Sequence, residues 1–350
     1  MSIKKFFRRF SFDSLASSLI SLLLSFVIGG LLIWAIGTNP FQAYYLIGVG
    51  AVGTMKNLAN TLASSIPLIF AGLAVAVSSK AGLLNLGVEG QLYMGAMAAT
   101  LCGLYLPATN RFILLIAIMI ASMLGGMLWA LIPGVLKAKF GTHEVIVAIM
   151  LNYVAELFTT YLIIVPFREH GSTVNQTAEI PKAARLSKLF PRTQLTTAFI
   201  LAVIVAIIVW FLLRRTTLGF KISAVGGNRD AARAGGINPT AYVIIAMLIS
   251  GAIASFAGTT EVVGKYFRFR ENFSPGFGFT GLAVAVLARN NPFGVIATSI
   301  LFGGLSTGCL YMSRITGISG HMSNVIQSII ILLVSAPRLF EIIKGSRKRT

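Results

Sequence analysis

The sequence predicts an all-α protein that crosses a membrane about ten times. Its 350 residues are 56% hydrophobic and 11% charged, whereas a soluble domain carries about 25% charged residues. The mean hydropathy is +0.83. A helix of about 20 apolar residues is long enough to span a bilayer. We place the predicted spans at residues 15–36, 62–77, 87–106, 112–136, 145–165, 195–213, 241–258, 277–288, 293–312 and 322–335.

The distribution of Lys and Arg predicts that both termini lie in the cytoplasm. Basic residues gather at the cytoplasmic edges of membrane proteins, although long loops follow this rule poorly. With ten crossings and an inner N-terminus, 18 of the 29 Lys and Arg residues fall inside. Without the long segment 166–194, the inner and outer counts become 18 and 6. The same excess accounts for the net charge of +19 without any nucleic-acid partner.

We therefore expect one transmembrane domain over residues 1–350, with four segments outside the membrane. These are a cytoplasmic N-terminus at 1–14, an extracellular loop at 166–194, a cytoplasmic loop at 214–239 and a cytoplasmic tail at 336–350. The extracellular loop either packs as a small cap or remains solvated.

Two of the predicted spans, 62–77 and 277–288, are short for a full crossing, which is typical of broken or re-entrant helices. These two spans also share the letters GLAVAV, at 72–77 and again at 281–286. The match is either chance or a structural repeat.

The stretch 79–94 is unusually polar for a region between two apolar runs. It contains Asn85, Glu89 and Gln91 among three glycines. Ionisable residues in membrane segments usually face a protein interior or a water-filled path. We expect these three side chains either to line a central path or to brace a broken backbone, with Glu89 near a helix N-terminus, where negative charge is favourable.

Other polar and aromatic side chains in the apolar spans are weaker candidates. Asn152 and Glu156 lie four residues apart, on one face of a helix. They either bind a hydroxyl group of a solute or bridge neighbouring helices. Phe277 and Phe279 either stack on a base or pack in the core, and Asn324 is a further candidate, as is Gln327.

The loop 214–239 contains the signals of one short helix. Asn228 is a favourable N-cap residue, and Asp230 falls in the first turn, where it complements the helix dipole. Two glycines at 235–236 then end the helix, and Pro239 follows. A short rigid helix of this kind either docks into a groove on a motor protein or is an ordinary solvated helix.

Several kinds of site are not indicated by the sequence. The two cysteines lie in apolar runs and the three histidines are scattered, so neither a disulfide framework nor a metal site is expected. No G-x-x-x-x-G-K-[ST] motif occurs, so the chain is not expected to bind ATP through a P-loop. No grouping of residues suggests nucleophilic catalysis, and we expect no enzyme activity and no cofactor.

Three segments resemble one family of membrane proteins. They are KAGLLNLGVEGQLYMGA at 80–96, AVGGNRDAARAGGIN at 224–238 and GFGFTGLAVAVLARNNPFG at 276–294. They are similar to the permease subunits of ATP-binding cassette importers for branched-chain amino acids, simple sugars and nucleosides. The similarity runs from about residue 59 to 336, and the form NLGVEGQ is most like the nucleoside permeases.

The resemblance implies a multi-pass permease in the bacterial cytoplasmic membrane. It implies alternating access, driven by a separate cytoplasmic ATPase that binds the ATP. A second, homologous permease and an external substrate-binding lipoprotein would complete the importer. Residues of the coupling helix would be Asn228, Arg229, Asp230, Ala232, Arg233 and Gly235. Many relatives carry an acidic residue where Gly227 stands here. The alternatives are ribose or other simple sugars, or branched-chain amino acids, as the solute of the same kind of importer, or an ion-coupled secondary transporter.

Overall fold

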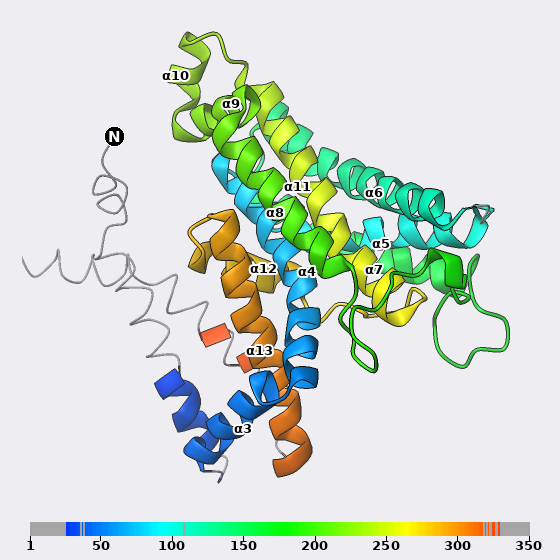
Figure 1. The fold of residues 1–350 in the computed structure, drawn as a ribbon. Coiled ribbons are helices and arrows are strands. Elements are labelled where there is room, and N and C mark those ends of the chain that lie inside the picture. The colour runs from blue at the N-terminus through cyan, green and yellow to red at the C-terminus, as the bar shows by residue number, and fades with distance from the viewer. Residues whose placement is uncertain are drawn as a thin grey trace, which may run out of the picture. The chain divides into compact units, whose positions relative to one another are not determined.

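The computed structural model describes residues 26–35, 37, 39–107, 110–317, 319, 321, 324–325 and 328–329 (Figure 1). The chain divides into two compact units. The larger unit is Ala59–Gly303, and the smaller one combines Met1–Leu58 with Gly304–Thr350. The predicted segments 1–14 and 336–350 lie outside the described residues, as do most of the spans 15–36 and 322–335.

The described residues are almost entirely helical, as the sequence predicts. The helices are α3 (Pro40–Val52), α4 (Met55–Lys80), α5 (Val88–Tyr105), α6 (Arg111–Phe140), α7 (Glu144–Ile164), the 3-10 turn η1 (Lys182–Ala184), α8 (Ala198–Arg215), α9 (Thr217–Gly227), α10 (Arg229–Ala234), α11 (Pro239–Glu261), the π-helical turn η2 (Val262–Tyr266), α12 (Phe277–Leu287) and α13 (Pro292–Thr316). A further helix covers Phe26–Ala35. Within the described part, β-pairing is limited to two isolated bridges.

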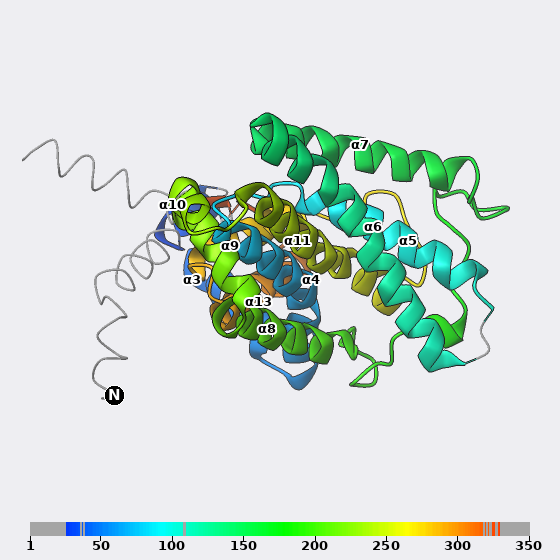
Figure 2. The ribbon, with the colours of Figure 1, turned by 90° about the horizontal axis from the view of Figure 1, so that it is seen from above.

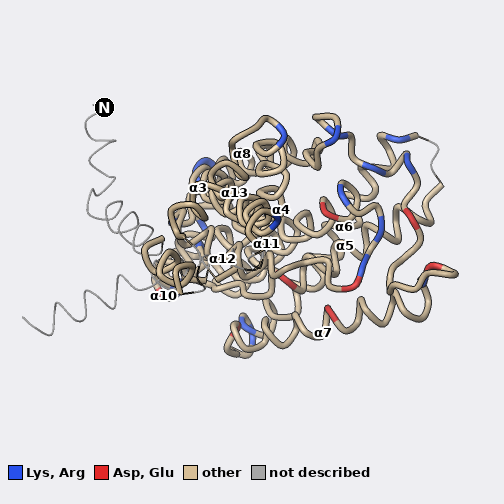
Figure 3. The backbone as a smooth tube through the Cα atoms, turned by 90° about the horizontal axis from the view of Figure 1, so that it is seen from below, with Lys and Arg blue, Asp and Glu red and all other residues tan. Residues whose placement is uncertain are grey.

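Six of the described helices are long and apolar enough to cross a membrane, and a bent pair in the smaller unit would make a seventh. Each of the eight middle predicted spans coincides with one of the helices α4–α8 and α11–α13. The eighth span is short, as predicted, since α12 covers only 11 residues. Charged residues gather mainly in the connections between helices (Figure 3). The chain is therefore a polytopic helical membrane protein.

The prediction that the second span is short is wrong. It forms α4, which has 26 residues. The hydropathy pattern did not indicate the start of this helix, because its first turns are polar. Polar side chains in this part of the helix form local hydrogen bonds. Ser65 Oγ, for example, donates to the carbonyl oxygen of Leu62 at 2.7 Å. Along α4, 89% of the most apolar window is buried, against 22% in α6. The apolar part of α4 is therefore surrounded by protein, whereas the apolar α6 has the surface of a helix that faces lipid.

Two helices were not predicted. The first is α3, whose start is marked by the N-cap Asn39 and by Pro40 at the first helical position. The second is α9, in the loop expected to hold a single short helix. Its N-cap is Thr216, whose side-chain oxygen accepts a hydrogen bond from the backbone N–H of Gly219 at 3.1 Å.

The helices of the larger unit pack around α11, which contacts α5, α6 and α9. Seen from above, α7 lies at one side of this unit and α8 at the other (Figure 2). The hydroxyl groups of Ser122 in α6 and Thr259 in α11 are 2.5 Å apart and buried. The helices α9 and α10 lie at one end of α8, and the segment 166–194 lies at the other (Figure 1).

The two GLAVAV sequences meet in the larger unit. They form parts of α4 and α12, and the helices touch where Gly281 faces Ala71 and Gly72. A Cβ atom added at Gly281 would lie 2.4 Å from the Cβ atom of Ala71. Small residues allow membrane helices to approach closely. The two segments with the sequence GLAVAV therefore lie where α4 and α12 cross.

Candidate functional site

The polar stretch singled out in the sequence forms a break between α4 and α5, which we name the elbow (residues 81–87). Asn85 and Gln91 form a reciprocal amide pair there, at 3.0 and 3.2 Å. Asn85 Nδ2 also donates to Ser250 Oγ of α11 at 2.8 Å. Ser250 Oγ in turn donates to the carbonyl oxygen of Ala74 in α4 at 2.7 Å. This buried network ties the elbow to three helices.

Asn152 of α7 holds the same elbow from the other side. Its Oδ1 accepts a hydrogen bond from the backbone N–H of Gly90 at 2.8 Å, and its Nδ2 donates to the carbonyl oxygen of Leu86 at 2.8 Å. The side chain is 6% exposed. Both ends of the amide are therefore bonded to backbone groups that the break in the helix leaves without helical partners.

Glu89 joins the elbow to α12. It lies in the first turn of α5, is 8% exposed, and accepts a hydrogen bond from the backbone N–H of Gly278 at 2.5 Å. A Cβ atom added at Gly278 would lie 2.5 Å from the backbone nitrogen of Glu89, so the two backbones are in direct contact. The N-terminal turns of two helices meet at one carboxyl group, and their dipoles stabilise negative charge there, whereas burial opposes it.

The other candidates in the larger unit are not part of this cluster of hydrogen bonds. Glu156 is half-buried one turn after Asn152, and its carboxyl group forms no ion pair among the described residues. Phe277 is half-buried, and Phe279 is 46% exposed. Asn324 is exposed and belongs to the smaller unit. Gln327 lies outside the described residues.

Sequence reasoning missed a further buried carboxyl group in the membrane helices. Glu261, near the end of α11, is 4% exposed, and its Oε2 lies 2.8 Å from Nζ of Lys265. The spacing of four residues could have revealed this pair. Because both charges are matched within one helical segment, the pair stabilises the π-helical turn that ends α11.

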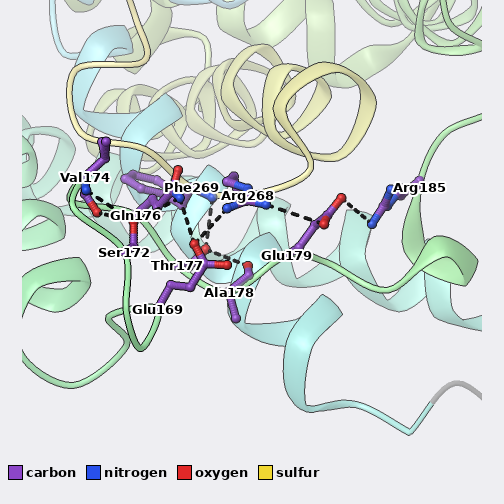
Figure 4. Close-up of polar contacts among 10 residues, drawn as sticks. All are labelled: Glu169, Ser172, Val174, Gln176, Thr177, Ala178, Glu179, Arg185, Arg268 and Phe269. Atoms are coloured by element: carbon purple, nitrogen blue, oxygen red, sulfur yellow. Dashed lines mark hydrogen bonds and ion pairs between the residues drawn. The ribbon is translucent and has the colours of Figure 1, made fainter.

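The segment 166–194 packs as a cap. Two carboxylates of this segment bind Arg268, which lies in the connection after α11. The guanidinium of Arg268 lies 2.8 Å from the carboxylate of Glu169 and 3.4 Å from that of Glu179 (Figure 4). Arg185 forms a second ion pair with Glu179, at 2.7 Å. These ion pairs connect three positions of the segment with one another and with the connection after α11.

Backbone hydrogen bonds hold the same segment in place. The N–H of Thr177 donates to the carbonyl oxygen of Phe269 at 3.0 Å, and that of Ile180 donates to Phe267 at 2.8 Å. The N–H of Leu186 donates to Val263 in the π-helical turn at 3.2 Å. Of the two alternatives for this segment, the structure shows the packed cap.

The short helix predicted in the loop 214–239 is confirmed as α10. Asn228 is its N-cap, and its Oδ1 accepts hydrogen bonds from the N–H groups of Asp230 and Ala231 at 2.9 and 3.0 Å. Gly235 ends the helix. Five of the six predicted coupling residues are exposed, and the sixth, Ala232, is buried against the core of the larger unit.

The elbow is a structural joint rather than a reaction centre. Its amide and carboxyl groups are bonded to backbone groups, to a hydroxyl group and to one another, so the hydrogen bonds described here pair no acid with a base. Among the described residues, no group of three His, Cys, Asp or Glu side chains is placed to hold a metal ion. The hydrogen bonds of this site hold the helix ends in register.

Comparison with known proteins assigns the chain to a family. The model described as "Branched-chain amino acid transport system / permease component" matches residues 57–335. The chain belongs to this family. It is thus a multi-pass protein of the cell membrane and a transport component rather than an enzyme.

Three relatives of the permease match it over nearly its whole length. The guanosine ABC transporter permease protein NupP of Bacillus subtilis is 35% identical and covers 95% of this chain and 96% of its own. The nucleoside ABC transporter permease protein NupB of Lactococcus lactis is 33% identical, with 94% and 93% covered. The glucose ABC transporter permease protein TsgB13 of Haloferax volcanii is 31% identical, with 92% and 87% covered.

Proposed function

We propose that this permease is the membrane-spanning subunit of an importer for nucleosides. The observation that carries the proposal is the similarity to a guanosine permease over 95% of the chain and to a nucleoside permease over 94% of it. A sugar is the second candidate solute, because the glucose permease is 31% identical.

The importer needs further subunits, because the family is named as the permease component of a transport system. A cytoplasmic ATPase binds and hydrolyses ATP, a second permease completes the path, and an external substrate-binding lipoprotein delivers the solute. We place α9, α10 and both termini on the cytoplasmic side. The cap 166–194 is on the outer side, and this agrees with its position at the opposite end of α8.

The geometry supports a division of roles among the candidate residues. Asn85, Glu89, Gln91 and Asn152 brace the elbow, since each is bonded to the protein and nearly fully buried. Glu156, Phe277 and Phe279 remain the candidates for lining the path, because their side chains are partly accessible and near the same joint.

Transport by the complete importer tests the proposal. In proteoliposomes that contain both permeases, the ATPase and the lipoprotein, we expect accumulation of labelled guanosine only when ATP is hydrolysed. Unlabelled uridine should compete, whereas glucose and leucine should not. Uptake driven by an ion gradient without ATP would overturn the importer class, and competition by glucose alone would overturn the nucleoside assignment.

Attachment of the ATPase tests the role of α10. Replacing two exposed charged side chains together, Arg229→Ala with Asp230→Ala, keeps the helix propensity high but removes two of the three charges of α10. We expect several-fold less ATPase to co-purify with the permease. Ser223→Ala, on the exposed surface of α9, is the control and should leave the recovery unchanged. Equal recovery from both variants would mean that the ATPase docks elsewhere.

A further inference from the structure

The backbone of α9 touches the backbone of the α4–α5 connection at Gly226. A Cβ atom added at Gly226 would lie 2.1 Å from the carbonyl oxygen of Lys80 and 2.8 Å from the nitrogen of Gly82. Gly82 has φ +72°, and its own added Cβ atom would lie 3.2 Å from the carbonyl oxygen of Gly226. No side chain separates the helix from the turn. The neighbouring Gly227 has no atom within 4 Å of its added Cβ.

Side chains around this contact connect it to α10. A buried apolar cluster includes Ala81 and Leu83 of the elbow, Ile222 and Val225 of α9, and Ala232 of α10. Ala232 is the buried residue of α10, and the other side chains of that helix point outward. A displacement of α10 therefore presses on the cluster that surrounds Gly226 and Gly82.

The other end of the elbow is bonded to α12. Asn85 and Gly87 lead directly into the first turn of α5, where Glu89 accepts the N–H of Gly278. The backbones of Gly226 and Gly82 are in contact at one end of this route, and those of Glu89 and Gly278 are in contact at the other. Packed interiors transmit strain because they are dense, and a contact without side chains has no rotamers with which to absorb a displacement.

We propose that Gly226 and Gly82 are positioning residues that transmit movement of the α9–α10 pair through the elbow to the N-terminus of α12. The inference rests on the proposed function, since an ATPase must move α10. The inference adds the route by which movement driven by nucleotide hydrolysis is transmitted to the elbow. Gly226, which touches the turn, must be glycine, whereas its neighbour Gly227 can be replaced by a larger residue.

A matched pair of variants tests the route. Gly226→Ala forces the two backbones apart, whereas Gly227→Ala adds the same methyl group to open space on the same helix. The reporter is Phe279→Cys on α12, in a background in which Cys102 and Cys309 are replaced by Ala. The measurement is the rate at which N-ethylmaleimide alkylates position 279 in the assembled complex. It is made without nucleotide and again with ATP and vanadate, and ATP hydrolysis is measured in parallel.

In the reporter background without a glycine substitution, we expect nucleotide to change the alkylation rate several-fold. Gly227→Ala should preserve this change, and Gly226→Ala should abolish it while the complex still hydrolyses ATP. An equal change in both variants would overturn the proposed route and leave the importer assignment intact. If the unsubstituted reporter complex neither hydrolyses ATP nor responds to it, the proposed function fails and the route with it.

A gentler variant covers the case in which Gly226→Ala prevents assembly. Asn tolerates the left-handed conformation, and its Cβ atom at position 82 would lie 3.2 Å from the carbonyl oxygen of Gly226. Gly82→Asn therefore shifts the contact by only a few tenths of an ångström. We expect a reduced response at position 279 in an assembled complex, and an undiminished response would overturn the inference.

Discussion

Replacing Glu89 by Gln is expected to lower guanosine uptake about tenfold while the permease still assembles with its partners. The carboxyl group is buried and accepts the N–H of Gly278 at 2.5 Å. Hydrogen bonds to charged groups contribute about 1.5–3 kcal/mol, against about 1 kcal/mol for neutral ones. Gln keeps the shape and an acceptor oxygen but loses the charge that two helix N-termini favour. The contact between α5 and α12 is therefore weakened by roughly the difference between these two hydrogen-bond energies. This corresponds to about a factor of ten in the population of complexes in which the two helices are held together.

The measurement is the initial rate of uptake in proteoliposomes, with the recovery of the complex as a check on folding. Glu271→Gln is the matched control, because it makes the same change at an exposed carboxyl group in the connection before α12. It should retain most of the uptake. Glu89→Ala should be more severe than Glu89→Gln, since it also leaves the N–H of Gly278 without its acceptor. Normal uptake by a well-assembled Glu89→Gln complex would remove the joint from the mechanism.

The sequence indicated most of the polar residues at the elbow, but it did not indicate the residues to which they are hydrogen-bonded. Polar residues in an apolar region predict a break in the helix, and Asn85, Glu89 and Gln91 are all at the elbow. The sequence could not show what they bind. Ser250 lies 165 positions from Asn85, and Gly278 lies 189 positions from Glu89. Such contacts depend on tertiary packing, which local patterns do not specify.

The cap illustrates the same limit. Its composition is polar and includes three prolines, so local reasoning cannot distinguish a packed segment from a solvated loop. The distinction depends on Arg268, which lies 99 positions from Glu169. The short helix α10, by contrast, was predicted correctly, because its N-cap and its terminating glycines are local signals. The start of α4 was missed because hydropathy registers polarity and not the local hydrogen bonds that satisfy it.

Replacing Gly281 by Ala is expected to destabilise the permease far more than replacing Gly72 by Ala, although both glycines open the same six letters. An added Cβ at Gly281 would meet the Cβ atom of Ala71 at 2.4 Å and its carbonyl carbon at 2.9 Å. No side-chain rotation relieves a clash with backbone. At Gly72 the nearest atoms are methyl groups of Val284 and Val295, at 2.8 and 2.9 Å, which rotation about χ1 can displace.

Both substitutions gain about 1 kcal/mol of helix propensity, so their difference isolates the steric effect at the crossing of α4 and α12. Overpacking costs about 1–3 kcal/mol, and the larger figure applies where helices must move apart. Thermal unfolding of the purified protein in detergent should show a clearly lower midpoint for Gly281→Ala than for Gly72→Ala. Equal midpoints would mean that the two helices are free to separate. In that case α12 would not be held against α4, and a displacement arriving through Glu89 would move it without resistance from this crossing.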